Sequence, residues 1–568
     1  MRILQLFMTI FFFSSFFSSY LKAEVFYVSS QQEFDRAQNN SIENDSIIWR
    51  SGTYSNIFME IEKNRLFVVA EDLGSVIFTG FSRVDVKGDY ITLEGFQFLD
   101  GNIGTRDVVN IRGSHIVFTQ INIRAYTCYK YLRVREESQF VEITYCNFEN
   151  RLNLDDQNIL SILVDEDQPG YHKIQYCSFK NFDGTGNDLG IEPIRIGLST
   201  QADRNSRSLV EYCYFTQCNG DGEIISSKAS QNVYRYNTFE DNPLSELVLR
   251  HGSEAVVYGN FFLNGKGGVR VREGQNHYIY NNYFYELDDR AIFLQNKSSD
   301  PLGNINIAFN TIIDCSEVIL GGNGNHKPTQ VTFANNLFAN PDDNLFEEAT
   351  RTETWINNIA FGDLGISLPA SGITATNPLL EENSEGFFGL AENSPAINAA
   401  QVGYAAIPQF EGMEAVDTDI LLDLMKQSRP VVVEEKDLGS NEYPHAVLIR
   451  PMATEANTGP SYNTSSTTSS QNISSRVTDL IRVQPNPVRD QLLMEINIKN
   501  GTNLRIDIFN SAGRIVQTIT EQSLLPNQTV LSKNVENWSA GLYTIRAFSR
   551  NAEKGFESIQ VVKFVKSR

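Results

Sequence analysis

The sequence predicts an all-β protein, a parallel β-helix (solenoid) followed by a small β-sandwich. From about residue 91, a β-rich run ending in Cys or Asn, any residue and then an apolar side chain recurs every 22 to 28 residues or so. These turns have no helical periodicity, and each is too short for a pair of helices. Beyond a Ser- and Thr-rich stretch, a second set of short alternating strands occupies roughly the last 90 residues.

The repeat indicates parallel strands stacked about 4.8 Å apart. Wider gaps before two of the landmarks, Phe179 and Phe215, indicate inserted loops. The landmark residues that end the runs are Phe98, Ile123, Phe148, Phe179, Phe215, Phe239, Phe262, Phe284, Ile312, Phe338 and Ala360.

One position of the repeat is occupied first by Cys and then by Asn. We expect an internal ladder at a bend, in which Asn amides bond to one another and Cys fills the same place as a small apolar group. Stacked turns rarely give good disulfide geometry, and no CxxC or HExxH motif occurs, so disulfides and a zinc site are not expected. The ladder residues are Cys146, Cys177, Cys213, Asn237, Asn260, Asn282, Asn310, Asn336 and Asn358.

The chain is predicted to have four parts. An irregular cap is expected over 24–90, and a region that closes the solenoid is expected after Ala360. The parts are a signal peptide (1–23), the β-helix (24–452), a flexible Ser- and Thr-rich linker (453–475) and the β-sandwich (476–568).

The first 23 residues have the features of a secretory signal. Arg2 is followed by a short apolar core at 10–17, and cleavage is expected after Ala23. The alternative, a membrane anchor, is disfavoured because serines interrupt a run that is already too short to span. No other apolar run approaches spanning length, so the mature protein is expected to be exported and to have no transmembrane segment.

The formal net charge is -22 and the pI is near 4.8. Nucleic-acid binding needs a basic surface, so this acidity argues against a nucleic-acid partner. The protein as a whole repels anions, and an anionic substrate must therefore meet a local cluster of Lys and Arg.

Such a cluster lies between residues 219 and 284. Counting from the landmarks places Arg250 and Arg272 at equivalent positions, and Lys228 falls one residue after that position. We expect these three cations along one edge of the solenoid, about one strand spacing apart. Arg195, on the preceding turn, is expected to extend the row.

Carboxylates accompany these cations. Glu223 and Glu246 occupy equivalent positions, Asp221 lies two residues before Glu223, and His251 follows Arg250 directly. Each residue alone has a simpler interpretation, as a solvated charge, a charge balance or a structural histidine. Their coincidence on adjacent turns favours a functional site.

The chemistry of this cluster suits β-elimination in a uronic-acid polymer. A proton alpha to a carboxylate is weakly acidic, and pairing that carboxylate with Arg or a metal stabilises the enolate-like transition state. A Lys flanked by other cations has a destabilised ammonium and can act as a base.

The motifs of this region resemble polysaccharide lyase family 6, the right-handed parallel β-helix lyases that include alginate lyases and chondroitinase B. The resemblance covers roughly residues 24–450. The matching motifs are IRIG (194–197), DGEIISSKAS (221–230), LRHG (249–252), GGVRV (267–271) and KDLGSNE (436–442).

The resemblance implies roles for these residues. Lys228 is the base that removes the C5 proton, and Arg250 is the group assigned as acid toward the departing O4. Because Arg is a poor proton donor at neutral pH, we expect Arg250 to stabilise the leaving oxygen instead. The substrate-binding residues are Arg195, His251, Arg270 and, from its place in the row, Arg272.

The resemblance also implies Ca²⁺, with Asp221 and Glu223 as candidate ligands. Calcium-binding members have an Asn ligand, two Gly and a Glu before the IRIG turn, but here Leu189 stands at the place of that Asn. Asp221 also replaces a Glu. Asn187, Asp188 or Glu192 could compensate, or water and an Arg could do the work of the metal.

The C-terminal part resembles the type A sorting domain of the type IX secretion system. The resemblance implies export through the outer membrane, then surface attachment or release. An accessory carbohydrate-binding module is the alternative, although no cluster of aromatics for sugar stacking stands out. The matching pieces are VQPNPVRDQL (483–492), IFNSAGRIV (508–516), WSAGLYTIR (538–546) and VVKFVKS (561–567).

The sequence therefore predicts a secreted or surface-attached lyase for an anionic polysaccharide, with alginate as the favoured substrate. Two alternatives stay open. One is a lyase for dermatan or chondroitin sulfate, and the other is a noncatalytic solenoid that binds acidic glycans.

Overall fold

The computed structural model consists of two compact units, Val25–Ser469 and the C-terminal residues from Ser470 together with the first 24 residues. Nearly all of the predicted signal peptide and the linker from 463 onward lie outside the described residues. The described residues are 23–153, 157–184, 190–297, 302–444, 452–462, 481–484, 491–496, 504–510, 515–521, 529–538, 541–551 and 555–566.

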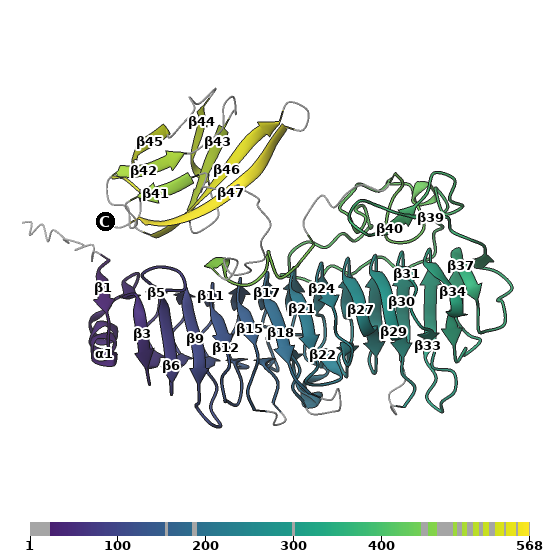
Figure 1. Ribbon diagram of the computed structural model, residues 1–568, viewed down its shortest axis with the longest axis horizontal. Helices are drawn as coiled ribbons and strands as arrows, with labels where there is room; N and C mark the ends of the chain where they lie inside the picture. Colours follow the sequence, from purple (N-terminus) through teal and green to yellow (C-terminus); the bar gives the residue numbers. More distant parts are fainter. Residues whose placement is uncertain are drawn as a thin grey trace, which may run out of the picture. The chain divides into compact units, whose positions relative to one another are not determined.

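The larger unit is a parallel β-solenoid, as predicted, whose turns contribute strands to three parallel ladders (Figure 1). The first ladder contains β1 (Val25–Val28), β2 (Ser46–Trp49), β5 (Phe67–Ala70), β8 (Thr92–Glu94), β11 (Val117–Thr119), β14 (Glu142–Thr144), β17 (Lys173–Gln175), β20 (Leu209–Glu211), β23 (Val233–Arg235), β26 (Val256–Tyr258), β28 (Gln275–Tyr280), β30 (Gly303–Ala308), β33 (Thr329–Ala334) and β36 (Thr354–Ile356).

The second and third ladders share two long strands, β27 (Phe261–Val271) and β29 (Tyr283–Leu294). The second ladder otherwise contains β3 (Gly52–Ser55), β6 (Val76–Gly80), β9 (Phe96–Gly101), β12 (Asn122–Arg124), β15 (Asn147–Glu149), β18 (Ser178–Phe182), β21 (Tyr214–Cys218), β24 (Thr238–Glu240), β31 (Thr311–Ile313), β34 (Leu337–Asn344), β37 (Asn358–Asp363) and β38 (Ile373–Ala375). The third contains β4 (Phe58–Ile61), β7 (Arg83–Val86), β10 (Val109–Ile111), β13 (Leu132–Val134), β16 (Leu160–Ile162), β19 (Ile194–Ile196), β22 (Glu223–Ser227), β25 (Glu246–Leu249), β32 (Val318–Ile319) and β35 (Phe346–Glu347).

The landmark residues stack in the core as the repeat predicted. Phe148 and Phe179 pair in register with ring centroids 5.0 Å apart, and the stack continues through Phe215 and Phe239. The predicted Asn ladder is confirmed as well. Each amide donates to the next, as Asn282 Nδ2 does to Asn310 Oδ1 at 3.0 Å, and the six cysteines are buried and free.

The N-terminal cap is shorter than predicted. Regular turns begin with β2. The landmark pattern missed the turns before Phe98, because Gly52 and Val76 occupy the bend position that later carries Cys or Asn. The cap itself is α1 (Gln31–Asn40), whose Phe34 is buried and stacks on Trp49 at 5.9 Å.

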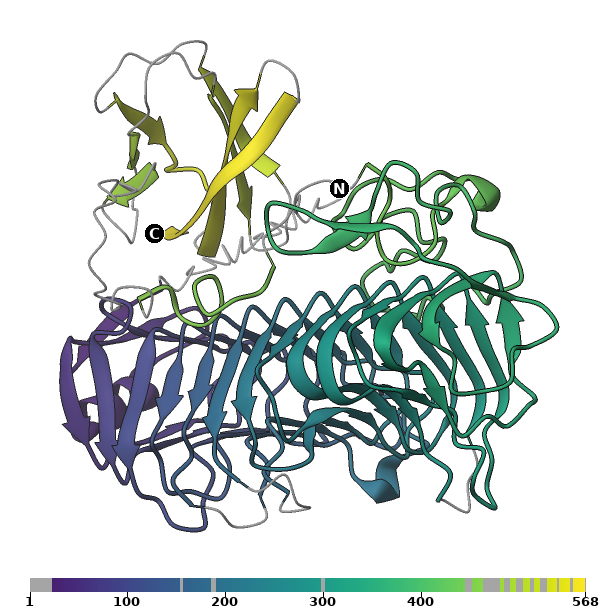
Figure 2. The ribbon, with the colours of Figure 1, turned by 45° about the vertical axis from the view of Figure 1, so that its right-hand side comes forward.

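The region after Ala360 does not simply close the end of the solenoid. Residues 376–443, which include the hairpin of β39 (Leu380–Glu382) and β40 (Phe388–Leu390), run back over the first ladder (Figure 2). Apolar side chains of this closing segment, such as Phe410 and Leu438, are buried against that ladder. A short 3-10 turn, Val433–Glu435, lies within it.

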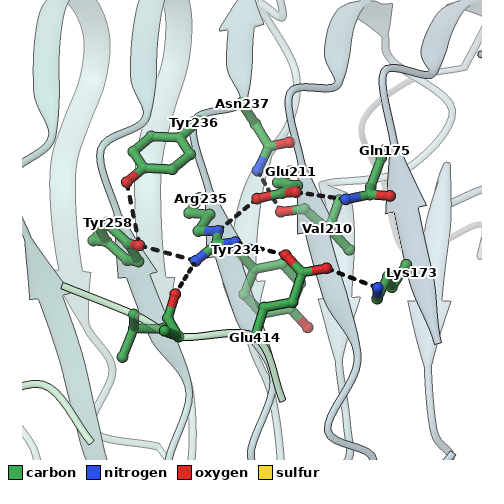
Figure 3. A network of polar contacts seen from close by, with 12 residues as sticks. Lys173, Gln175, Val210, Glu211, Tyr234, Arg235, Tyr236, Asn237, Tyr258 and Glu414 are labelled. Carbon is green, nitrogen blue, oxygen red and sulfur yellow. Dashed lines mark hydrogen bonds and ion pairs between the residues drawn. The ribbon is translucent and has the colours of Figure 1, made fainter. Parts of the chain in front are cut away.

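Ion pairs between charged side chains bind the closing segment to the first ladder (Figure 3). The Glu414 carboxylate accepts from Lys173 at 2.7 Å and from Arg235 at 3.3 Å. Arg235 also donates to buried Glu211 at 2.5 Å and to the Tyr258 hydroxyl at 3.2 Å. The part of the closing segment around Glu414 is therefore held by ion pairs as well as by apolar contacts.

The first part of the predicted linker is bound to the solenoid. Gly459 N–H donates to the Tyr176 carbonyl at 2.8 Å, Ser461 N–H donates to Gln120 at 2.7 Å, and the Tyr462 hydroxyl donates to the Phe96 carbonyl at 3.1 Å. Residues 453–462 thus belong to the solenoid unit. Their polar composition did not reveal this, because it does not show which groups of the bends they bond to.

The C-terminal unit contains seven described strands in two antiparallel sheets, which agrees with the predicted β-sandwich. The strands are β41 (Ile481–Gln484), β42 (Gln491–Ile496), β43 (Leu504–Asn510), β44 (Ile515–Glu521), β45 (Thr529–Asn534), β46 (Gly541–Asn551) and β47 (Gly555–Lys566). Among the described residues, no helix combines the length and the apolar character that a membrane span needs.

Candidate active site

Lys228, Arg250 and Arg272 stand level with one another just after β22, β25 and β27 of the third ladder. Ser227 pairs with Leu249 and Leu249 with Val271, so the three cations occupy the next position on three adjacent turns. The one-residue offset predicted for Lys228 is wrong, because a register shift between Glu223 and Ile225 absorbs it. We call these three residues the cation row.

Arg195 was expected to extend the cation row, but it does not lie in that row. It pairs with Ser226, and Ser226 pairs with Val248 and Val248 with Arg270. Arg195 and Arg270 therefore share a parallel row, two residues earlier along each strand and on the same outward side, because side chains alternate along a strand. Gly197 holds the cation-row position on the Arg195 turn.

Buried Glu192 holds the guanidinium of Arg195. The carboxylate is 2% exposed and accepts from Arg195 Nη2 at 2.7 and 2.6 Å and from Nε at 3.0 Å. Burial raises the pKa of Glu192 to about 7, and the charge of Arg195 opposes that shift. The bidentate geometry fixes the direction of the guanidinium.

The two arginines of the cation row share a second buried carboxylate. Glu223, 3% exposed, accepts from Arg250 Nη1 at 2.8 Å and lies 3.9 Å from Arg272 Nη1. This contact holds Arg250 beside Lys228 on the next turn.

Sequence reasoning missed the partners on the far side of the row. Glu246, which is buried, lies 3.5 Å from Arg270 Nη1 and accepts from Arg290 Nη2 at 2.8 Å. The equivalence of Glu246 to Glu223 could have revealed this partner, because each carboxylate holds an arginine of the following turn.

His251 is oriented by Glu273, another residue that the sequence did not single out. The carboxylate Oε2 lies 3.2 Å from His251 Nδ1 and also accepts from the His251 backbone N–H at 3.1 Å. Burial lowers the pKa of His251, although Glu273 opposes that shift. The imidazole is thus held next to Arg250 and is disposed to be neutral.

Lys228 is the one cation of the row without a carboxylate in contact, within the described part of the chain. Burial lowers the pKa of its ammonium, and the positive charge of Arg195 lowers it further, with a smaller contribution from Arg250. Glu192 and Glu223 oppose the shift. The neutral amine that a base requires is therefore more accessible here than on an exposed Lys.

Asp221 and Glu223 make other contacts among the described residues, and a calcium site there stays a prediction. Asp221 is turned to the backbone, accepting from Gly190 N–H at 2.6 Å and from Glu223 N–H at 3.0 Å. One oxygen of Glu223 faces Arg250, and only its buried Oε2 lacks a hydrogen-bond partner. The described residues contain no group of three or more candidate ligands, whereas Ca²⁺ takes six to eight oxygens. Leu189, Asn187 and Asp188 lie outside the described residues.

Comparison with known families identifies the family of the solenoid. The family model described as Chondroitinase B matches residues 28–315, which is half of the chain and includes Lys228, Arg250 and the carboxylates that surround them. The chain belongs to the chondroitinase B family. This membership places it in polysaccharide lyase family 6, as its motifs predicted.

A second family model, the secretion system C-terminal sorting domain, matches residues 482–561. The chondroitinase B family member described here is accordingly exported by the type IX secretion system to the cell surface or the extracellular space. A search of curated proteins returned no match.

Three solved structures share the fold. The PL6 family alginate lyase AlyGC has 22% identity and a TM-score of 0.59 over 65% of this chain and 55% of that chain. A mannuronic acid specific family 6 lyase from human gut microbiota has 24% identity and a TM-score of 0.54 over 60% and 86%. A PL6 alginate lyase complexed with a trisaccharide has 19% identity and a TM-score of 0.54 over 66% and 92%. This chain thus spans about half the length of AlyGC.

Proposed function

We propose that this protein is a lyase that cleaves a 1,4-linked uronic-acid polymer, alginate, by β-elimination. The observation that carries the proposal is the register that sets Lys228, Arg250 and Arg272 side by side on adjacent turns. Alginate is favoured because two of the solved structures with this fold are described as alginate lyases.

In the proposed reaction, the substrate carboxylate lies among the arginines. Arg195, Arg270 and Arg272, with His251 beside them, bind that carboxylate and offset the charge that develops as C5 loses its proton. Buried Glu192 and Glu246 keep two of these guanidinium groups oriented before the substrate arrives.

Neutral Lys228 takes the C5 proton and becomes an ammonium. The electrons of the C5–H bond form the C4–C5 double bond, and the bond from C4 to O4 breaks. Arg250, which stays charged beside Glu223, donates hydrogen bonds to the departing O4, and water supplies its proton. The products are an unsaturated non-reducing end and a free hydroxyl.

The test is a panel of polymers followed by ultraviolet absorbance of the unsaturated uronate. We expect product from alginate, and blocks of mannuronate and guluronate then define the preference. Product from dermatan or chondroitin sulfate alone would favour the alternative substrate that the family description suggests. Polymer retention without product from any of them would support a noncatalytic glycan-binding solenoid instead.

The proposal does without calcium. Arg250 and Arg272 supply positive charge beside Glu223, where a metal would otherwise serve. We expect a chelator to leave the initial rate within about twofold and added Ca²⁺ to leave the melting temperature unchanged. Loss of activity on chelation that Ca²⁺ restores, and Mg²⁺ does not, would contradict this expectation.

A pH profile tests the role of Arg195. Activity should rise with pH as Lys228 loses its proton, and Arg195 lowers the pKa at which that occurs. Arg195→Gln removes this charge, so the acid limb of kcat/KM should move to higher pH. Arg270→Gln is the matched control, and it should lower kcat/KM without moving the limb. An unmoved limb in Arg195→Gln would contradict the assignment of Lys228 as the base.

A further inference from the structure

A second group of cations lies on the third ladder, toward its N-terminal end. Lys130, Arg133 and Arg135 belong to β13 and its flanks, and we call them the distal cation cluster. Arg133 pairs with Ser161, and Ser161 pairs with Arg195, so Arg133 shares the row of Arg195 two turns away.

Arg135 lies in the same row as Lys228. Backbone N–H groups at successive positions of this row donate to the preceding turn, from Arg135 to Ile111, Leu163 to Val134, Gly197 to Ile162 and Lys228 to Ile196. Three turns at about 4.8 Å each separate Arg135 from Lys228, a distance of about 14 Å along the solenoid.

The distal cation cluster is held in the same way as the candidate active site. Asp107 forms an ion pair with Arg133: Oδ1 accepts from Nη2 at 3.0 Å, and Oδ2 lies 3.0 Å from Nε. Arg135 Nε donates to Asn110 Oδ1 at 2.7 Å. The cluster is therefore ordered without substrate, with Arg135 partly exposed at its edge.

Positive charge exceeds negative charge in this cluster. Lys130 is 6% exposed and donates to two neutral amide oxygens, Gln157 Oε1 at 3.0 Å and Asn158 Oδ1. Among the described residues, Asp107 is the carboxylate that is hydrogen-bonded to the cluster. Burial, Arg195 and Arg133 lower the pKa of Lys130 to about 7, which is the response expected where cations crowd one another.

The described positions between the two sites carry mostly short side chains. The intervening positions of the two rows are Ser161, Leu163 and Gly197, and of these Leu163 alone has a side chain longer than a hydroxymethyl group. A polymer lying along the third ladder can thus pass from one set of cations to the other.

We infer that Lys130, Arg133 and Arg135 form a distal subsite that binds a carboxylate of the same uronan chain whose scissile bond lies at Lys228. The inference rests on the proposed function and extends it, because it makes turnover depend on chain length. Oligomers long enough to span three turns gain a charge-assisted contact that short oligomers cannot make.

The experiment compares Arg135→Gln with wild type on alginate oligomers of increasing length. We expect kcat/KM on long oligomers and polymer to fall roughly tenfold and kcat/KM on the shortest cleaved oligomer to stay within about twofold. Arg135→Lys should recover part of the loss. Arg124→Ala, an exposed cation on neighbouring β12, is the matched control for net charge and should behave as wild type.

Equal loss on short and long oligomers, or no loss on either, overturns the subsite. Melting temperatures of the full-length variants separate these outcomes from unfolding, because a destabilised fold lowers activity on every length. Affinity for uncleaved long oligomer in a Lys228→Ala background keeps the two proposals apart. Weaker binding by Arg135→Gln supports the subsite even if no polymer is cleaved, and unchanged binding overturns it whether or not the protein is a lyase.

Discussion

Lys228→Ala is expected to abolish measurable product formation while leaving polymer binding nearly intact. Loss of a positioned base costs about 10²- to 10⁴-fold in rate, and no other amine lies in the cation row. The lost group acts on the C5 proton in the transition state, so kcat should fall and KM should change little. Initial rates from ultraviolet absorbance, with binding of long oligomer measured separately, check both parts.

Lys266→Ala is the matched control for this experiment. Lys266 lies on β27, close in the chain to the cation row, and its Nζ donates to the carbonyl of Leu244 at 3.5 Å. It should retain wild-type activity. Full activity in Lys228→Ala, or equal losses in both variants, would remove Lys228 from the mechanism.

Asn282→Ala is expected to destabilise the solenoid by about 3 kcal/mol or more. Asn282 Nδ2 donates to Val257 O and to Asn310 Oδ1, both at 3.0 Å. Its Oδ1 accepts from Asn260 N–H and Nδ2, both at 3.0 Å. Alanine leaves these buried groups short of partners, at about 1 to 3 kcal/mol for each one that stays unsatisfied. The shift of the denaturant midpoint measures the loss.

Cys213→Ala, at the equivalent position of the ladder, is the comparison. The thiol makes weak bonds to Ile174 O at 3.5 Å, to Glu211 O at 3.4 Å and to the Cys177 thiol, and Cys213 N–H keeps its bond to Asn237 in the variant. We expect a loss of about 1 kcal/mol. Equal losses in the two variants would show that packing at the bend, and not amide pairing, sets the stability of the ladder.

The solenoid was predictable because its information is local and repeated. Each turn places a Phe in the core and a Cys or Asn at the bend, so Phe148 stacks on Phe179 and Asn282 bonds to Asn310. The turns before Phe98 escaped notice because Gly52 and Val76 occupy that bend position. There the strands form through the same alternation, without the landmark.

Long-range contacts were less predictable. Glu414 reaches Lys173 across more than two hundred residues, and Tyr462 reaches the Phe96 carbonyl from a stretch whose composition indicated a linker. No repeat period or sequence motif predicts either contact, because each depends on where a nonrepetitive segment meets the solenoid.

The sequence by itself determined the β-helix, the sorting domain and the residue types of the candidate active site. It placed Lys228, Arg250 and Arg272 on adjacent turns, since strand spacing follows from the repeat. Only the tertiary structure decided that these three residues are level. A single bulge beside Ile224 shifts the register by one residue, and spacing alone cannot locate it.

The tertiary structure also decided which carboxylate orients which arginine. Glu192 lies three residues from Arg195, but Glu223 reaches Arg250 on the next turn and Glu246 reaches Arg290 two turns away. Stacking brings these charges together, and burial makes their pairing strong. These two effects turn a set of cations in the sequence into an oriented row beside a lysine whose pKa is lowered.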